Sequence, residues 1–198
     1  MFQGHLPEQK YESLADAAVK GKVILTESGA GARLWFTRDS GGQLNRDLAG
    51  RCGMYCGACE IYRAYKEAGK LRIDVARKHK CLPAEVKCEG CRAVHIVGWG
   101  RDEKWGRNCI ILACLKTKGL ETCGDCERIS ACQKLGVLAA EYQPLGMDLK
   151  ANLRSMHQLG LGPWLDQQDA RWRCQSCGAP VFVSSDDTRC HKCGAYQL

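Results

Sequence analysis

The spacing of apolar residues along the chain predicts a series of short helices. Positions three and four apart are apolar in seven segments, which is typical of helices with one buried face. These segments are 7–20, 56–68, 72–80, 109–118, 127–135, 149–159 and 163–170. Glycines follow several of them and predict where the helices end, and Asn108 is the expected N-terminal cap of the fourth.

The first 47 residues predict a different local structure. After the helix that ends at Gly21, residues 22–26 and 33–37 read as two strands joined by a glycine-rich turn. Gly29 and Gly31 in that turn do not indicate a phosphate-binding loop, because a strand and not a helix follows them. We therefore expect a helix and a β-hairpin in this segment.

Together these elements predict a small, metal-stabilised α+β protein in four parts. Residues 1–47 form the helix and hairpin, and residues 48–136 form a cysteine-rich core of short helices. Residues 137–170 carry no cysteine and form a helical spacer, and residues 171–198 form a zinc ribbon. The length of 198 residues suits one ordinary domain or two small ones.

Fifteen cysteines dominate the chemistry of the chain. No apolar stretch is long enough for a membrane span, and residues 1–20 lack the apolar region of a secretion signal. We therefore expect a cytoplasmic protein without a membrane partner. Because thiols stay reduced in the cytosol, the cysteines indicate metal binding and not disulfides.

The formal net charge of +7 raises the question of a nucleic-acid partner. A divalent metal held by four thiolates carries a net charge of −2, so about three such sites would cancel most of the surplus. The charge thus has an explanation without a polyanion. Nucleic-acid binding remains an alternative that would depend on Trp172 and four basic residues, Arg171, Arg173, Arg189 and Lys192.

The most specific pattern lies near the C-terminus. Two Cys-x-x-Cys-Gly turns, Cys174 to Gly178 and Cys190 to Gly194, bracket a strand-like segment at residues 181–183. Each such turn holds two sulfurs at about the separation that a tetrahedral ion needs, so the pair predicts a closed four-thiolate zinc ribbon. Redox-active dithiols would need a helix behind each pair. His191 is expected to face solvent.

The core contains a compact triple of cysteines and two further Cys-x-x-Cys turns. Cys52-x3-Cys56-x2-Cys59 has the spacing of radical enzymes that use S-adenosylmethionine, but those need a long series of strands and helices that this chain lacks. Cys81 stands apart and reads as a buried thiol. The candidate core ligands are Cys52, Cys56, Cys59, Cys88, Cys91, Cys109, Cys114, Cys123, Cys126 and Cys132.

The sequence does not decide which core cysteines share a site. Cys109 and Cys114 are about 140° apart on a helix, so we expect them to serve different sites or to straddle the start of the helix. Thiolates bind zinc and iron–sulfur clusters alike, so the core metal is either Zn or [4Fe–4S].

Several of these motifs resemble the DUF3795 family of bacteria and archaea. The resemblance rests on Arg51-Cys-Gly-Met-Tyr-Cys-Gly-Ala-Cys-Glu-Ile-Tyr, Val86-Lys-Cys-Glu-Gly-Cys-Arg and Gly119-Leu-Glu-Thr-Cys-Gly-Asp-Cys-Glu, and it extends over about residues 48–198. It implies that Cys52, Cys56, Cys59, Cys88, Cys91, Cys123 and Cys126 are the recurring metal ligands of the family. Five residues separate Cys126 from Cys132 where the family pattern has about four.

These observations leave three possible functions. The first is a non-catalytic metalloprotein that docks onto a partner protein. The second is an iron–sulfur electron-transfer or accessory protein of an anaerobic enzyme, and the third is a nucleic-acid-binding zinc protein. The sequence leans against an enzyme, because it has no nucleophile elbow or zincin motif and a four-thiolate site has no open position for water.

Overall fold

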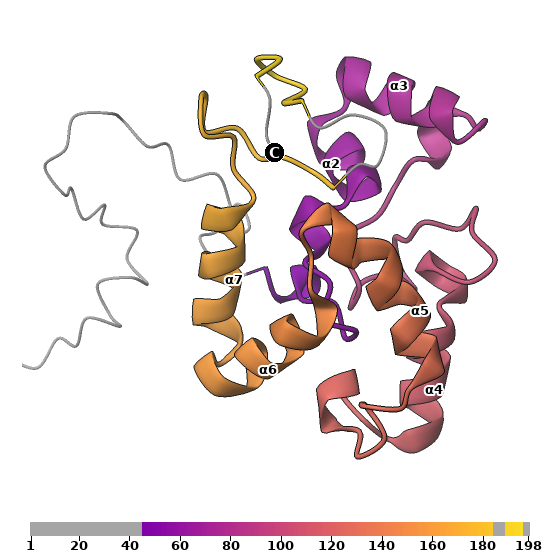
Figure 1. The fold of residues 1–198 in the computed structure, drawn as a ribbon. Coiled ribbons are helices and arrows are strands. Elements are labelled where there is room, and N and C mark those ends of the chain that lie inside the picture. Colours follow the sequence, from indigo (N-terminus) through magenta and orange to yellow (C-terminus); the bar gives the residue numbers. More distant parts are fainter. Residues whose placement is uncertain (1–44, 184–188, 196–198) are drawn as a thin grey trace, which may run out of the picture.

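The computed structural model describes residues 45–183 and 189–195, and these ranges are built from helices (Figure 1). The α-helices are α2 (Glu60–Glu67), α3 (Gly69–Lys78), α4 (Ile110–Lys118), α5 (Gln133–Tyr142), α6 (Leu149–Leu159) and α7 (Leu161–Arg171). Short 3-10 helices are η1 (Arg46–Leu48), η2 (Cys56–Ala58), η3 (Pro83–Glu85), η4 (Gly106–Asn108), η5 (Cys123–Asp125) and η6 (Gln143–Leu145). None of the helices in these ranges has the length and apolar character needed to cross a membrane.

The predicted α+β fold class is wrong for the described part of the chain. Strand-type pairing there consists of isolated bridges, among them Ala49 with Tyr55 and Arg173 with Pro180, and the described residues form no sheet. Pro180 has no N–H and so cannot extend a ladder. The segment at 181–183 forms no strand, because the Val183 N–H donates to the Ala58 carbonyl, 2.8 Å away, on the 3-10 helix η2. The predicted N-terminal helix and hairpin lie outside the described residues.

Glycine predicts some helix ends correctly and fails at one. Helix α4 ends at Gly119, which adopts the left-handed conformation, and α6 ends at Gly160. The predicted helix at 127–135 is wrong: residues before Gln133 form turns, and α5 continues through Gly136 to Tyr142. Burial of apolar side chains on α5 outweighs the modest cost of a glycine in a helix.

Asn108 does not cap α4. Its side-chain amide donates to the carbonyl of Asp102 at 2.7 Å, and Cys109 occupies the N-cap position without a capping side chain.

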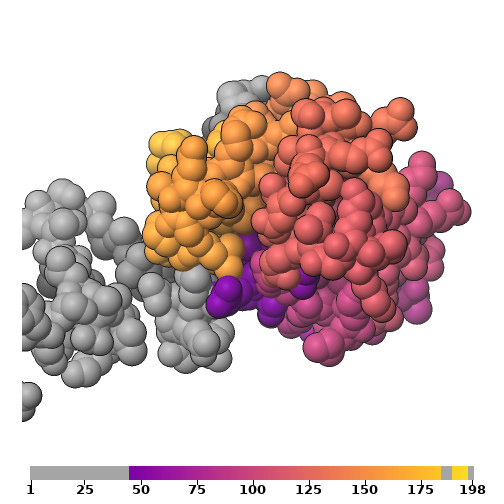
Figure 2. Space-filling view, turned by 90° about the horizontal axis from the view of Figure 1, so that it is seen from below, coloured from indigo at the N-terminus to yellow at the C-terminus, as the bar shows by residue number. Residues whose placement is uncertain are grey.

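Two apolar clusters stabilise the fold. The larger one lies among α4 to α7 and the loop that carries the first cysteines, and at its centre Trp164 is fully buried with its ring 6.1 Å from that of Tyr55. The smaller cluster joins α2 and α3 through Ile61, Val75 and Trp99. Figure 2 shows the molecule from below. The surface formed by α4, α5 and their connecting loop lies in the middle, with α6 and α7 on one side and the residues before α4 on the other.

Helix α6 positions the loop that carries Cys52. The buried amide of Asn152 donates to the Gly53 carbonyl at 2.8 Å. Gly53 has φ +92°, and a Cβ there would lie 2.1 Å from the backbone oxygen of Leu149. Only glycine fits this close approach, so the tight packing on α6 determines where the first cysteines lie.

Candidate metal centres

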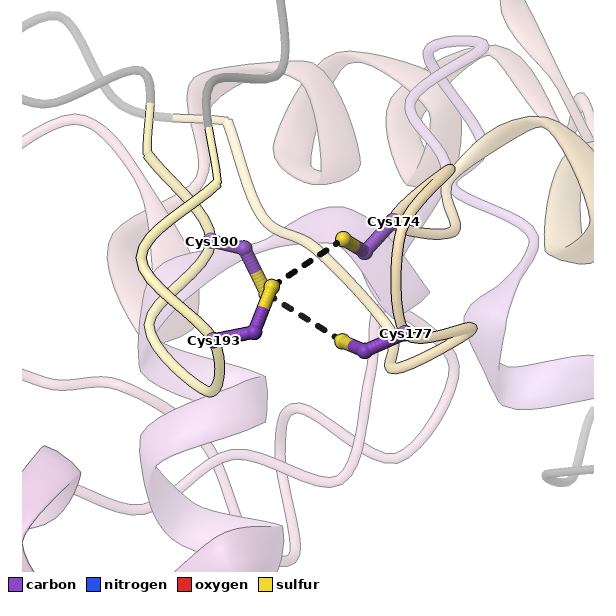
Figure 3. Close-up of side chains that lie close together, drawn as sticks. All are labelled: Cys174, Cys177, Cys190 and Cys193. Atoms are coloured by element: carbon purple, nitrogen blue, oxygen red, sulfur yellow. Dashed lines mark hydrogen bonds between the residues drawn. The ribbon is translucent and has the colours of Figure 1, made fainter.

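Two turns near the C-terminus bring four cysteines together. The sulfurs of Cys174, Cys177, Cys190 and Cys193 all lie within 4.8 Å of one another. Figure 3 shows the two turns facing each other with their sulfurs directed inward. The Cys174 and Cys193 sulfurs are 3.6 Å apart, and those of Cys177 and Cys190 are 3.8 Å apart. We refer to this group as the C-terminal four-cysteine site.

The two turns have the same local geometry. In each turn the carbonyl of the first cysteine accepts a hydrogen bond from the glycine that follows the second, at 2.9 Å for Gly178 and 2.8 Å for Gly194. Both glycines have positive φ, 70° and 72°, which favours glycine at this place in the turn. The sequence motif thus forms the turn locally, while the fold brings the two turns face to face.

The sulfur spacing suits a single metal ion. Tetrahedral zinc with Zn–S bonds of about 2.3 Å places its sulfurs about 3.8 Å apart. The Ala179 N–H favours the thiolate of Cys177, but burial and the three neighbouring thiols raise its pKa to about 12. Four adjacent thiolates therefore need a cation among them, and this site can hold a metal ion.

A carboxylate on helix α2 attaches the second turn to the helical core. Glu67 Oε2 accepts from His191 Nε2 at 2.9 Å and from Lys192 Nζ at 2.8 Å, and these two residues lie between Cys190 and Cys193. Burial alone would raise the pKa of Glu67, but the hydrogen bonds from His191 and Lys192 lower it below its usual value. The expectation that His191 faces solvent is wrong, since its side chain is only 14% exposed.

The first turn is attached to α7. Arg173 donates to Asp169 Oδ2 through Nη2 at 2.5 Å and through Nε at 3.1 Å, and it also reaches the Gly178 carbonyl at 3.1 Å. Asp169 in turn accepts from the Tyr55 hydroxyl at 3.4 Å. The Cys-x-x-Cys-Gly motif did not identify Glu67 or Asp169. Glu67 lies far in sequence from the cysteines that it supports, and Asp169 lies on the adjacent helix α7, outside the motif.

In the core, one residue brings three distant segments together. The Arg51 N–H donates to the Cys91 sulfur at 3.5 Å, and the Arg51 carbonyl accepts from the Cys123 N–H at 2.8 Å. Glu121 forms ion pairs with both Arg51 and Arg92, which lie next to core cysteines. Cysteines far apart in sequence therefore meet around Arg51.

Six core cysteines have thiols that lie near one another, namely Cys52, Cys56, Cys59, Cys88, Cys91 and Cys109, and Cys123 also lies near Cys52. Burial raises the pKa of Cys52 and Cys56, and the Cys91 thiol adds to both effects. Burial also raises the pKa of Cys59 to about 11. These buried thiols favour binding to a metal, which would compensate the cost of ionising them.

The other four core cysteines lie around a hollow between α4 and α5, namely Cys114, Cys123, Cys126 and Cys132. Burial and four neighbouring thiols, Cys132, Cys114, Cys126 and Cys109, raise the pKa of Cys123 to about 12. Cys109, at the start of α4, adjoins Cys52 and Cys91 and also lies near Cys123. Cys81 packs against the smaller apolar cluster.

Comparison with protein families finds a match for residues 48–137 in the family described as a protein of unknown function, DUF3795. The resemblance seen in the sequence is confirmed over this range, which holds all ten candidate core ligands. Residues 138–198, with the C-terminal four-cysteine site, lie beyond the match. No curated protein and no solved structure matches the chain.

Proposed function

Since residues 48–137 form a DUF3795 segment, we propose that the chain is a non-catalytic, metal-binding accessory protein. In this proposal one zinc ion, held by the C-terminal four-cysteine site, fastens the end of the chain to the helical core. The core cysteines bind further metal.

The sulfur geometry of the C-terminal four-cysteine site carries this proposal. Four sulfurs with spacings of 3.6 and 3.8 Å match the tetrahedron that zinc imposes. Four protein ligands fill that tetrahedron and leave no position for water or substrate, which supports a structural role. The contacts of Glu67 and Asp169 explain what the ion would stabilise, because they tie one turn to α2 and the other to α7.

We propose a protein and not a nucleic acid as the partner. The basic side chains near the site are engaged within the molecule: Lys192 pairs with Glu67, Arg173 with Asp169, and Arg171 donates to the Gly146 carbonyl at 2.7 Å. Phosphate contacts would have to displace these partners. Reduced thiolate ligands also favour a reducing compartment, so we propose a cytoplasmic location.

An iron–sulfur accessory or electron-transfer protein is the second candidate. The buried cluster of core thiols favours it, since Cys52, Cys56 and Cys59 are surrounded by other cysteines and have raised pKa values. Thiolates in such surroundings are the usual ligands of iron–sulfur clusters.

Elemental analysis of the full chain tests the zinc assignment. Protein purified without oxygen should contain about one zinc per chain at the C-terminal four-cysteine site. The Cys177→Ser change should remove that zinc and leave the metal of the core in place. Cys81→Ser is the matched control, because it makes the same change at a cysteine outside the candidate sites, and it should keep the full metal content. A Cys177→Ser variant that keeps as much zinc as the wild type would contradict the assignment.

A further inference from the structure

The hollow between α4 and α5 differs from the C-terminal four-cysteine site in shape and in lining. Four of the residues around it are cysteines, and the others are aliphatic or lysine side chains. The lining residues are Ile111, Cys114, Leu115, Lys118, Cys123, Cys126, Ile129, Cys132 and Lys134. The hollow contains about 370 Å³ of space, part of it open to solvent.

Three separate elements supply its four cysteines. Cys114 lies on α4, Cys123 begins η5 and Cys126 is its C-cap, and Cys132 is the N-cap of α5. Thr122 caps η5 by accepting from the Gly124 N–H at 3.2 Å, and its own N–H donates to Asp125 at 2.7 Å. The turn is therefore held rigidly, with two of its cysteines directed to the same hollow as those of α4 and α5.

The spacing of these four sulfurs distinguishes a site for a single metal ion from a site for an iron–sulfur cluster. Among the described residues, only the C-terminal four-cysteine site brings three or more possible ligand atoms within 4.8 Å of one another, and the cysteines of the hollow do not meet this spacing. The four sulfurs of the hollow are therefore spread more widely than the roughly 3.8 Å spacing of a zinc tetrahedron. A cubane cluster spreads its four thiolates over a core of eight atoms, so it needs such a wider arrangement.

The electrostatic surroundings suit an anionic cluster. A [4Fe–4S] core with four thiolates carries a net negative charge. Lys118 Nζ lies 3.3 Å from the Cys126 sulfur, and Lys134 also lines the hollow. Ile111, Leu115 and Ile129 supply the apolar wall that limits the access of water.

We propose that Cys114, Cys123, Cys126 and Cys132 hold a [4Fe–4S] cluster, separate from the zinc site at the C-terminus. The proposal rests on the proposed function only in treating the chain as a metal-binding protein. It assigns four of the ten core cysteines to one site and assigns that site a metal different from that of the C-terminal four-cysteine site.

Iron and sulfide analysis of anaerobically reconstituted full-length protein tests the assignment. The Cys126→Ala and Cys132→Ala variants should each lose about four iron and four sulfide per chain, together with the matching part of the visible absorbance. Cys81→Ala, a thiol outside the hollow, should lose none. Zinc at the C-terminal four-cysteine site should stay at one per chain in all three variants, which shows that the loss of metal is confined to the hollow.

A milder change keeps the test valid if a ligand variant unfolds. Lys118→Met keeps all four cysteines and most of the side-chain volume but removes the charge beside Cys126. It should bind the cluster and lose it to oxygen or chelator several times faster than the wild type. Unchanged iron in both cysteine variants, or zinc and no iron in the wild-type hollow, would overturn the proposal. A wild-type protein that holds the cluster but no zinc at the C-terminal four-cysteine site would instead count against the proposed function.

Discussion

Helix α2 carries two carboxylates with the same kind of partners, and this allows a matched test of how the C-terminal four-cysteine site is attached. Glu67 accepts from His191 and Lys192 next to the proposed zinc ligands, whereas Glu60 accepts from Lys78 and His79 of the neighbouring α3 segment. We predict that Glu67→Ala weakens zinc binding at the C-terminal four-cysteine site and that Glu60→Ala does not.

The expected magnitude follows from the exposure of the partners. The His191 side chain is 14% exposed, so its charge-assisted hydrogen bond is worth about 1.5–3 kcal/mol. Lys192 is 54% exposed and adds about 0.2–1 kcal/mol. The other oxygen of Glu67 is buried without a hydrogen-bond partner, which offsets part of this gain. A net loss of about 2 kcal/mol corresponds to a fall in zinc affinity of about thirtyfold at most.

Competition with a coloured zinc chelator measures this affinity directly, and limited proteolysis reports whether residues 189–195 leave the surface of α2. Glu67→Ala should lose zinc at roughly ten to thirty times lower chelator concentration than the wild type. Glu60→Ala should show wild-type zinc affinity and a lower thermal midpoint. The reasoning fails if Glu67→Ala changes the affinity less than about twofold, or if both variants change it equally.

Three further predictions concern stability and metal removal. Gly53→Ala should lower the free energy of unfolding in urea by about 3 kcal/mol, because its Cβ would meet the Leu149 oxygen at 2.1 Å; Gly136→Ala, with nothing within 4 Å, should instead raise it by about 0.5–1 kcal/mol. Trp164→Phe should cost less than about 1.5 kcal/mol in the same assay, since the buried Trp164 N–H has no hydrogen-bond partner, whereas Trp164→Ala should cost about 4 kcal/mol. Mild chelation of zinc should expose residues 172–195 to protease while the helical core stays intact, and early cleavage within α4 or α5 would contradict this.

Local sequence patterns were reliable where one short segment determines its own structure. The Cys-x-x-Cys-Gly motif alone predicted both turns of the C-terminal four-cysteine site, because the glycine with positive φ and the hydrogen bond to the first cysteine lie within five residues. Gly119 and Gly160 likewise marked the ends of α4 and α6. Only contacts with distant segments explain the failures. The valines at 181–183 have strand propensity, yet Val183 bonds to Ala58 instead of to a strand.

Residue types and their spacing were enough to predict a chain rich in thiol ligands and a four-cysteine site near its C-terminus. They did not determine how the ten core cysteines divide, because composition and spacing are equally compatible with many pairings. Only the folded chain shows which cysteines are neighbours, since the backbone of Arg51 contacts both Cys91 and Cys123 while α4 and α5 bring Cys114 and Cys132 to one hollow. Partners separated by tens of residues are chosen by packing of the whole fold, which no local pattern records.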